Sequence, residues 1–196
     1  MQKQFFIVIG RSGCGKGTQA ELLQKSLTEK GVENIKHITT GGSFRTFIEG
    51  KSFASKSAKE ITNNGGLLPA FLAIWNWSNV FIETLQGNET VILDGAPRKM
   101  VEVEAIHSAI HFFGYDHATV LYVDVSETWA LDKLKSRGRE DDREVEDAKK
   151  KMEWFEEDVL PVLDMYSRDP RFKSVSYTHL RAHETKANLV CRLLLE

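Results

Sequence analysis

A glycine-rich stretch near the start of the chain constrains the fold more than any other part of the sequence. It reads Gly10-Arg11-Ser12-Gly13-Cys14-Gly15-Lys16-Gly17-Thr18-Gln19 and follows an apolar run, residues 5–9, that is typical of a buried parallel strand. Apolar residues then recur at helical spacing at Ala20, Leu23 and Leu27, so a helix is predicted to start near residue 15. A strand, a glycine loop and a helix in this order are the context of a phosphate-binding loop.

The residue types in this stretch suit a bound polyphosphate. Glycines allow the backbone amides to turn inward, and the helix N-terminus adds partial positive charge. Lys16 supplies an ammonium group for the outer phosphates. The alternative is a glycine-rich turn that only joins strand to helix, but the lysine in register and both flanks favour a nucleoside triphosphate site.

The position of the hydroxyl residue narrows the class of nucleotide-binding protein to which the chain can belong. The usual motif has Ser or Thr directly after the lysine to hold magnesium, whereas here Gly17 takes that place and Thr18 follows. The run 15–19 resembles the phosphate loop of the adenylate kinase family of nucleoside monophosphate kinases. The resemblance implies ATP as phosphoryl donor, with Mg²⁺ held mainly by ATP oxygens and water. The ATP-binding residues that it implies in the loop are Gly10, Ser12, Gly13, Cys14, Gly15, Lys16, Gly17 and Thr18.

A second segment with this resemblance follows a predicted strand at residues 35–38. Thr40-Gly41-Gly42-Ser43-Phe44-Arg45 is similar to the family's Thr-Gly-Asp-x-x-Arg, with Gly42 in place of the acid. The resemblance puts Thr40 near the acceptor base and Arg45 at the acceptor phosphate, which the arginine fork suits. Alone, Arg45 would be read as an ordinary surface arginine. Residues 40–85, which include the family-like Leu67-Leu68-Pro69, are too long for a structureless loop and are predicted to be a mobile insertion.

The third motif follows an apolar strand at residues 91–93. Asp94-Gly95-Ala96-Pro97-Arg98 resembles the family's Asp-Gly-Phe-Pro-Arg. The resemblance implies that Asp94 orients magnesium through water and that Arg98 clamps the phosphate under attack. A carboxylate at the end of a buried parallel strand would face the phosphates, although a strand-end cap is the plain alternative for Asp94 alone.

Glu102 stands where adenylate kinases have a glutamine that reads adenine, four residues after the motif's arginine. An ionised carboxylate accepts a hydrogen bond from the amino group of the base but cannot donate one to N1. We therefore expect weaker discrimination for AMP, with CMP or another amino-bearing base as a competing acceptor.

The fourth motif is the run Arg137-Gly138-Arg139-Glu140-Asp141-Asp142, which resembles the brief lid of the short family members. The resemblance implies that Arg137 and Arg139 meet the transferring phosphoryl group. Lys133 stands where an arginine commonly lies over the ATP base, and Lys151 where another meets the acceptor phosphate. Lysine keeps the charge but loses the planar fork. The neighbours of Lys151, residues 149 and 150, are expected on a solvated helix face.

Two histidines on a predicted helix raise the question of a metal site outside the phosphate region. His107 and His111 lie four residues apart, a spacing that can chelate zinc. No third ligand is evident nearby, which disfavours metal binding.

The order of elements predicts an α/β fold. Strands alternate with helices, which implies right-handed crossovers and a parallel sheet, and residues 172–175 can supply a fifth strand. With the resemblance, this gives a P-loop NTPase three-layer sandwich, a five-stranded parallel sheet with helices on both faces. The expected single domain has a core at 1–39, 86–136 and 144–174, a helical monophosphate-binding insertion at 40–85 and a short lid at 137–143.

Composition excludes several other classes. A formal charge of −2 argues against a general nucleic-acid binder, and no stretch approaches the roughly 20 apolar residues that span a bilayer. The two cysteines, Cys14 and Cys191, make no disulfide framework and suit a reducing cytosol. We expect a cytoplasmic monomer without nucleic-acid or membrane partners.

The C-terminal tail, residues 175–196, is expected to be foreign to the protein. The run 175–185 resembles one reading frame of a transposase-type sequencing adapter, and 189–196 resembles its far end in the same frame. The alternative is a native final strand and helix, because Leu189, Leu193 and Leu194 imitate an amphipathic pattern.

The four motifs in family order imply a nucleoside monophosphate kinase that moves the γ-phosphoryl group of ATP to AMP and gives two ADP. A UMP/CMP-type kinase and a catalytically weakened nucleotide-binding regulatory module are the alternatives. The implied catalytic residues are Lys16, Arg98, Arg137 and Arg139, and Lys133 and Arg137 would also contact ATP. The implied acceptor site consists of Thr40, Gly41, Arg45, Leu67, Leu68, Gly95, Arg98, Glu102, Arg139 and Lys151.

Overall fold

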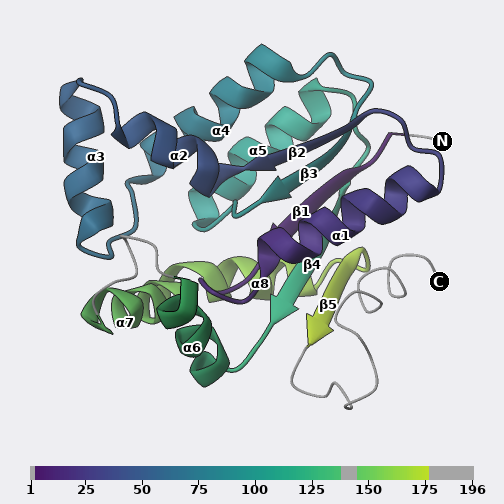
Figure 1. The fold of residues 1–196 in the computed structure, drawn as a ribbon. Helices are drawn as coiled ribbons and strands as arrows, with labels where there is room; N and C mark the ends of the chain where they lie inside the picture. Colours follow the sequence, from purple (N-terminus) through teal and green to yellow (C-terminus); the bar gives the residue numbers. More distant parts are fainter. Residues whose placement is uncertain (1–2, 138–144, 177–196) are drawn as a thin grey trace.

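Five parallel strands form the centre of the molecule, in a computed structural model that describes residues 3–137 and 145–176 (Figure 1). The strands are β1 (Phe5–Ile9), β2 (Ile35–Thr39), β3 (Thr90–Asp94), β4 (Ala118–Asp124) and β5 (Phe172–Ser176). They lie in the order β2-β3-β1-β4-β5, and every neighbouring pair is parallel. The predicted five-stranded parallel sheet is therefore confirmed.

Helices cover both faces of this sheet, because the side chains of the central strand alternate between two apolar cores. In β1, Phe5, Ile7 and Ile9 join one core, while Phe6 and Val8 join the other. The first core is closed by α4 (Ala70–Thr84), α5 (Met100–Phe112) and α8 (Leu160–Ser167), and the second by α1 (Lys16–Glu29), α6 (Glu127–Arg137) and α7 (Val145–Trp154). This is the predicted three-layer arrangement.

The segment between β2 and β3 is helical throughout most of its length. It contains α2 (Thr40–Ile48), α3 (Phe53–Asn63) and α4, and α2 and α3 lie to one side of the sheet (Figure 1). A small third core of Ala58, Leu68 and Leu72 holds these helices together, while Trp77 and Phe81 of α4 pack into the first core of the sheet. The segment thus has its own apolar centre and is anchored to the sheet through α4.

The helical stretch from Val145 to Ser167 is interrupted. A π-helical turn, η2 (Phe155–Val159), separates α7 from α8. Such turns insert an extra residue into a helix and often lie at functional sites. Among the described helices, none has the length and apolar character that crossing a bilayer requires.

The end of the chain falls partly outside the described residues. β5 includes Val175 and Ser176, the first two residues of the segment expected to be foreign, and Val175 pairs with Val123 of β4. Residues 177–196 lie outside the part of the chain that the structure describes, so the expectation for the tail stays a prediction.

Candidate active site

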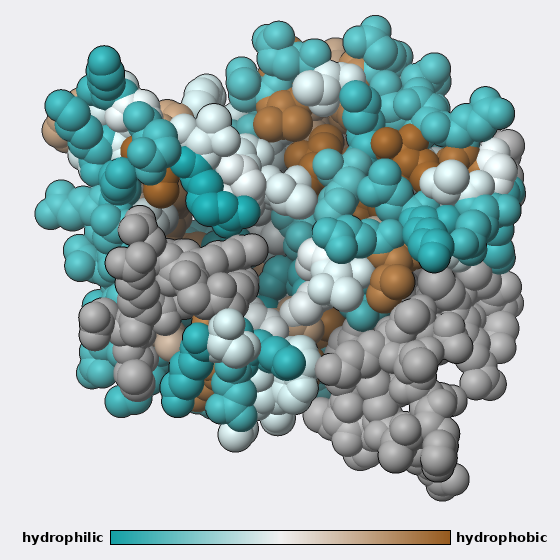
Figure 2. All heavy atoms as spheres, in the orientation of Figure 1, coloured by the Kyte–Doolittle hydropathy of each residue, from teal (hydrophilic) through white to brown (hydrophobic). Residues whose placement is uncertain are grey.

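A cavity of about 1180 Å³ opens at the carboxyl end of β1 and β3. Its walls come from the phosphate loop, from α2 and the start of α4, and from α6 and α7. Figure 2 shows hydrophilic side chains recessed between the α2–α3 side and the rest of the molecule. Ligands of open parallel sheets bind at this edge of the strands.

Nearly all of the described residues that the sequence assigns to the site line this cavity. They are Ser12, Gly13, Cys14, Gly15, Lys16, Gly17, Thr18, Thr40, Gly41, Arg45, Leu67, Leu68, Asp94, Gly95, Arg98, Glu102, Lys133 and Lys151. Gly10 is the exception, since it lines a small second cavity behind the loop. The fold therefore brings residues from six separate segments of the chain into one space.

The phosphate loop is shaped by glycines at positions where other residues would not fit. Gly13 has a φ of 84°, and a Cβ atom there would lie 2.6 Å from the backbone oxygen of Ala130. Lys16 Nζ donates to the carbonyl oxygens of Gly10 and Arg11, both at 2.8 Å. The lysine ammonium is thus held over the loop by neutral carbonyls, which phosphate oxygens can replace.

Cys14 in the same loop is a packing residue. Its side chain is 1% exposed, and burial raises the pKa of the thiol against the opposing charge of Lys16. A buried thiol with a raised pKa is a poor nucleophile.

Asp94 at the end of β3 faces the first turn of α1. Its Oδ2 atom lies 3.7 Å from the position of a Cβ atom on Gly17, so the carboxylate stands beside the phosphate loop. The described residues contain no cluster of three or more His, Cys, Asp or Glu side chains suited to a metal. One carboxylate beside a phosphate loop fits Mg²⁺ that is held mostly by nucleotide oxygens and water.

Thr40 and Arg98 meet at Gly95. Thr40 Oγ1 donates to the carbonyl of Asp94 at 3.2 Å, and Arg98 Nε donates to the carbonyl of Gly95 at 2.9 Å. Gly95 has a φ of 92°, and a Cβ atom there would lie 2.8 Å from Thr40 Oγ1. The contact explains locally why glycine is required between the aspartate and the arginine.

Arg45 folds back toward the start of α2. Its Nη1 atom lies 3.3 Å from the position of a Cβ atom on Gly41. At Gly42, where the family has an acid, a Cβ atom would lie 2.4 Å from Thr39 Oγ1. A side chain at that position would require Thr39 to move, which gives a local reason for the glycine.

Glu102 has a structural role that the sequence analysis missed. Its Oε1 atom accepts hydrogen bonds from the backbone N–H groups of Arg98 and Lys99, at 3.2 and 3.1 Å, and so caps the start of α5. The side chain is 2% exposed, and burial raises the pKa of its carboxyl above the ordinary value, against these hydrogen bonds. A glutamate in the first turn of a predicted helix is the signal that would have indicated a cap.

The three lysines of α7 have different environments. Lys151 is 7% exposed and lines the cavity, and Lys149 pairs with Glu146 on the surface at 3.8 Å. Lys149 and Lys150 are both exposed, as expected, although Lys150 is also hydrogen-bonded. Lys150 Nζ donates to the carbonyl of Asn64 at 2.9 Å, because the α3–α4 turn lies against α7.

The residues predicted for the lid fall largely outside the part of the chain that the structure describes. Arg137 is the last residue of α6, but its side chain, Arg139, Asp141 and Asp142 lie outside the described residues. On the neighbouring turn of α6, Lys133 Nζ lies 5.4 Å from the ring centre of Trp129, and both residues line the cavity.

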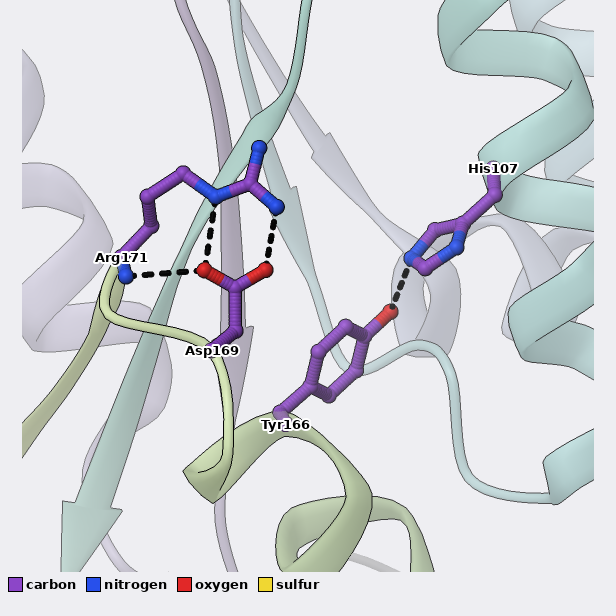
Figure 3. Close-up of polar contacts among 4 residues, drawn as sticks. All are labelled: His107, Tyr166, Asp169 and Arg171. Atoms are coloured by element: carbon purple, nitrogen blue, oxygen red, sulfur yellow. Dashed lines mark hydrogen bonds and ion pairs between the residues drawn. The ribbon is translucent and has the colours of Figure 1, made fainter.

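His107 is engaged with another helix. Its Nε2 atom lies 3.2 Å from the hydroxyl of Tyr166 in α8, next to the paired Asp169 and Arg171 (Figure 3). Burial, and next the positive charge of Arg171, lower the pKa of His107. The contact between His107 and Tyr166 connects α5 to α8.

Two aromatic residues at the end of α7 contact arginines of the site, which the sequence analysis also missed. The guanidinium of Arg98 lies 5.3 Å from the ring centre of Trp154, and that of Arg11 lies 4.5 Å from the ring centre of Phe155. Arg11 also pairs with Glu156 at 3.0 Å. Trp154 follows Lys151 by three residues on one helix face, and that spacing was the available signal.

Comparison with known proteins agrees with this geometry. Residues 8–170 match the family model described as adenylate kinase. Similar proteins are the adenylate kinases of Mycolicibacterium paratuberculosis (34% identical, over 82% of this chain and 84% of the relative), Mycobacterium leprae (32%, 83% and 86%) and Bacteroides thetaiotaomicron (29%, 87% and 88%). Because the family model matches most of the chain, and two of these relatives are more than 30% identical over most of their length, the chain belongs to the adenylate kinase family.

Proposed function

We propose that this protein is a nucleoside monophosphate kinase that transfers the γ-phosphoryl group of ATP to AMP and gives two ADP. The observation that carries the proposal is the convergence of Lys16, Asp94 and Arg98 on one cavity at the carboxyl end of the strands. A volume of about 1180 Å³ exceeds the roughly 300–1,000 Å³ of ordinary small-molecule sites, which suits two nucleotides.

The two nucleotides would occupy opposite parts of the cavity. ATP would place its phosphates on the loop 10–18, with its base toward Trp129 and Lys133 of α6. The acceptor would lie toward α2, between Thr40, Arg45 and the leucines 67 and 68. This arrangement puts the acceptor phosphate next to Arg98.

Transfer of a phosphoryl group needs positioning and charge neutralisation more than covalent help from the protein. Lys16 would exchange its two loop carbonyls for phosphate oxygens, and Arg98 would hold the phosphate with its N–H fork. Arg137 and Arg139 would add charge from the lid. An already ionised acceptor phosphate hardly needs a general base.

Mg²⁺ would be held by Asp94 through water, with Thr18 nearby in the loop. When bound, it supplies positive charge at the phosphate oxygens of ATP. We propose further that the insertion 40–85 and the lid 137–143 close over the substrates and exclude water, which would otherwise hydrolyse ATP.

The proposal also concerns which base the acceptor nucleotide carries. Glu102 lines the cavity while one of its oxygens is engaged by two backbone amides. A carboxylate there favours bases that carry an amino group, so CMP is the alternative acceptor to AMP. The arginines 45 and 98 in the cavity argue against a module that only binds ATP, because ATP binding alone does not require them.

A coupled assay for ADP, with and without AMP, tests the function. We expect ADP formation that depends on AMP; ATP binding without it would instead support the regulatory module. AMP, CMP, UMP and GMP in competition then test the base. Strict AMP selectivity that survives Glu102→Ala would show that Glu102 does not read the base.

We also propose that the protein acts as a cytoplasmic monomer without nucleic-acid or membrane partners. The net charge of −2 and the lack of a disulfide framework support this setting. Light scattering on a sizing column tests the monomer, and a mass of about twice 22.2 kDa would contradict it.

A further inference from the structure

The π-helical turn after α7 brings two successive aromatic side chains to two arginines. Trp154 ends α7 and Phe155 begins η2, and their rings lie beside Arg98 and Arg11 respectively. The extra residue of a π turn changes the direction in which the helix faces point. The turn thus lies where α7 passes the phosphate loop and the turn before α5.

The contact of Trp154 with Arg98 has the geometry of a cation–π interaction. The guanidinium carbon lies 5.3 Å from the ring centre, within the roughly 6 Å that such contacts span. The indole Nε1 atom is buried and has no hydrogen-bond partner in the part of the chain that the structure describes. Trp154 therefore contacts Arg98 through the face of its ring and not through a polar group.

Arg98 is constrained from other directions by its own segment. Its Nε atom donates to the carbonyl of Gly95, and its backbone N–H donates to Glu102. The next residue, Lys99, lies 3.7 Å from Asp158 of η2. The turn before α5 is thus docked on the π turn beside the stacked pair, and the ring of Trp154 adds an apolar wall on the cavity side.

We infer that Trp154 is a positioning residue, which holds the guanidinium of Arg98 in the orientation that clamps the transferring phosphate. Stacking uses the face of a guanidinium, whereas phosphate binding uses its N–H edge, so both interactions can occur together. The inference rests on the proposed function, because it gives Arg98 the role proposed above.

Kinetics of three single variants test the inference. Trp154→Leu keeps apolar bulk but removes the ring, and kcat is expected to fall by roughly 10- to 100-fold, as when a reacting group is misplaced by about 1 Å. The KM for ATP stays close to that of the wild type, because the phosphate loop is untouched. Trp154→Phe restores a ring face and keeps kcat within about threefold of the wild type. Phe112→Leu is the control and should leave kcat unchanged, since Phe112 is 81% exposed at the end of α5 and lies outside the cavity lining.

A double variant separates positioning from general damage. In an Arg98→Lys background, Trp154→Leu is expected to cost little further activity, because the effects of substituting two residues that act as a unit are not additive. An equal loss in both backgrounds would overturn the inference, as would a kcat of Trp154→Leu within about threefold of the wild type.

The Nε–H resonance of Arg98 gives a readout that needs neither activity nor a folded leucine variant. Identified by its loss in Arg98→Lys, it is expected to move downfield in Trp154→Phe, because indole shields this proton more strongly than a phenyl ring while the hydrogen bond to Gly95 is kept. An unchanged shift in Trp154→Phe would overturn the inference even where all variants are inactive. A shifted resonance in a protein that makes no ADP from ATP and AMP would instead remove the proposed function and leave the stacking in place.

Discussion

At the scale of single residues, the charge of Lys16 and Arg98 is expected to carry phosphoryl transfer. Lys16 Nζ donates to the carbonyls of Gly10 and Arg11 and lies 3.8 Å from Cys14 Sγ, and Arg98 is held by Gly95 and Trp154. Lys16→Ala and Arg98→Ala each remove a group that would stabilise charge in the transition state. We expect kcat to fall by about 10²- to 10³-fold, equivalent to roughly 3–4 kcal/mol.

Lys25→Ala is the matched control for this prediction. Lys25 lies on α1 with its side chain 73% exposed and pairs with Glu29 at 4.0 Å. It carries the same charge on the same helix, yet it should keep normal turnover. Circular dichroism establishes that the variants are folded, and near-normal turnover in Lys16→Ala or Arg98→Ala would remove the site as assigned.

Glu102 gives a pH dependence of stability whose sign follows from burial. Because the pKa of its carboxyl is raised in the folded state, the contribution of Glu102 to stability is largest below the ordinary value of 4.5 and is lost as pH rises through the folded pKa. Glu102→Gln keeps an oxygen that can accept from Arg98 and Lys99 but does not ionise. The melting temperature of Glu102→Gln relative to the wild type should therefore rise with pH from about 4.5 upward. A difference that is constant or falls over that range would contradict this.

At the scale of elements, the α3–α4 turn is fitted against α7 by one glycine. Gly65 has a φ of 70°, and a Cβ atom there would lie 2.7 Å from the Cα atom of Asp147. Lys150 adds a hydrogen bond to the same turn through the carbonyl of Asn64. The turn belongs to the segment predicted to hold the acceptor and α7 follows the lid, so this contact joins the two sides of the cavity.

Gly65→Ala is expected to cost more stability than Gly31→Ala. Gly31 also has a positive φ, of 85°, but a Cβ atom there meets nothing within 4 Å. Gly31→Ala therefore costs only the backbone term of about 1–2 kcal/mol, and Gly65→Ala adds the clash with Asp147. Urea unfolding of both variants measures the difference, and equal losses would show that α7 yields to the added methyl group.

The elements that the sequence predicted well are those with strong local signals. The phosphate loop, β1 and β3 follow from glycines and short apolar runs. The helix α2 begins at Thr40 and continues through Gly41 and Gly42, where propensity gives little support, because Phe44, Phe47 and Ile48 pack into the small third core. The amino-acid sequence of residues 155–159 contains no comparable local signal for the π turn.

At the scale of the whole molecule, the family motifs predicted most of the residues that line the cavity. They did not predict the residues that hold those side chains in place. Trp154 and Arg98 are 56 positions apart, and Arg11 and Glu156 are separated by 145. The spacing of Lys151 and Trp154 indicates that both lie on one face of α7, but the partners of that face depend on how α7 crosses the sheet edge, which no local spacing encodes. The cap by Glu102 differs from these contacts, because it is local and has a sequence signal, a glutamate in the first turn of α5.

The last prediction concerns the tail, whose resemblance to a sequencing adapter implies that it was never selected to pack on this fold. Deletion of residues 177–196 should therefore leave the free energy of unfolding within about 1 kcal/mol of the full chain. Deletion from residue 172 onward is the control, because it also removes β5, which pairs with β4 through five residues. We expect that longer deletion to be clearly destabilising in urea unfolding. A large loss on removing 177–196 alone, or uninterrupted genomic reads that encode the tail across codon 174, would establish it as native.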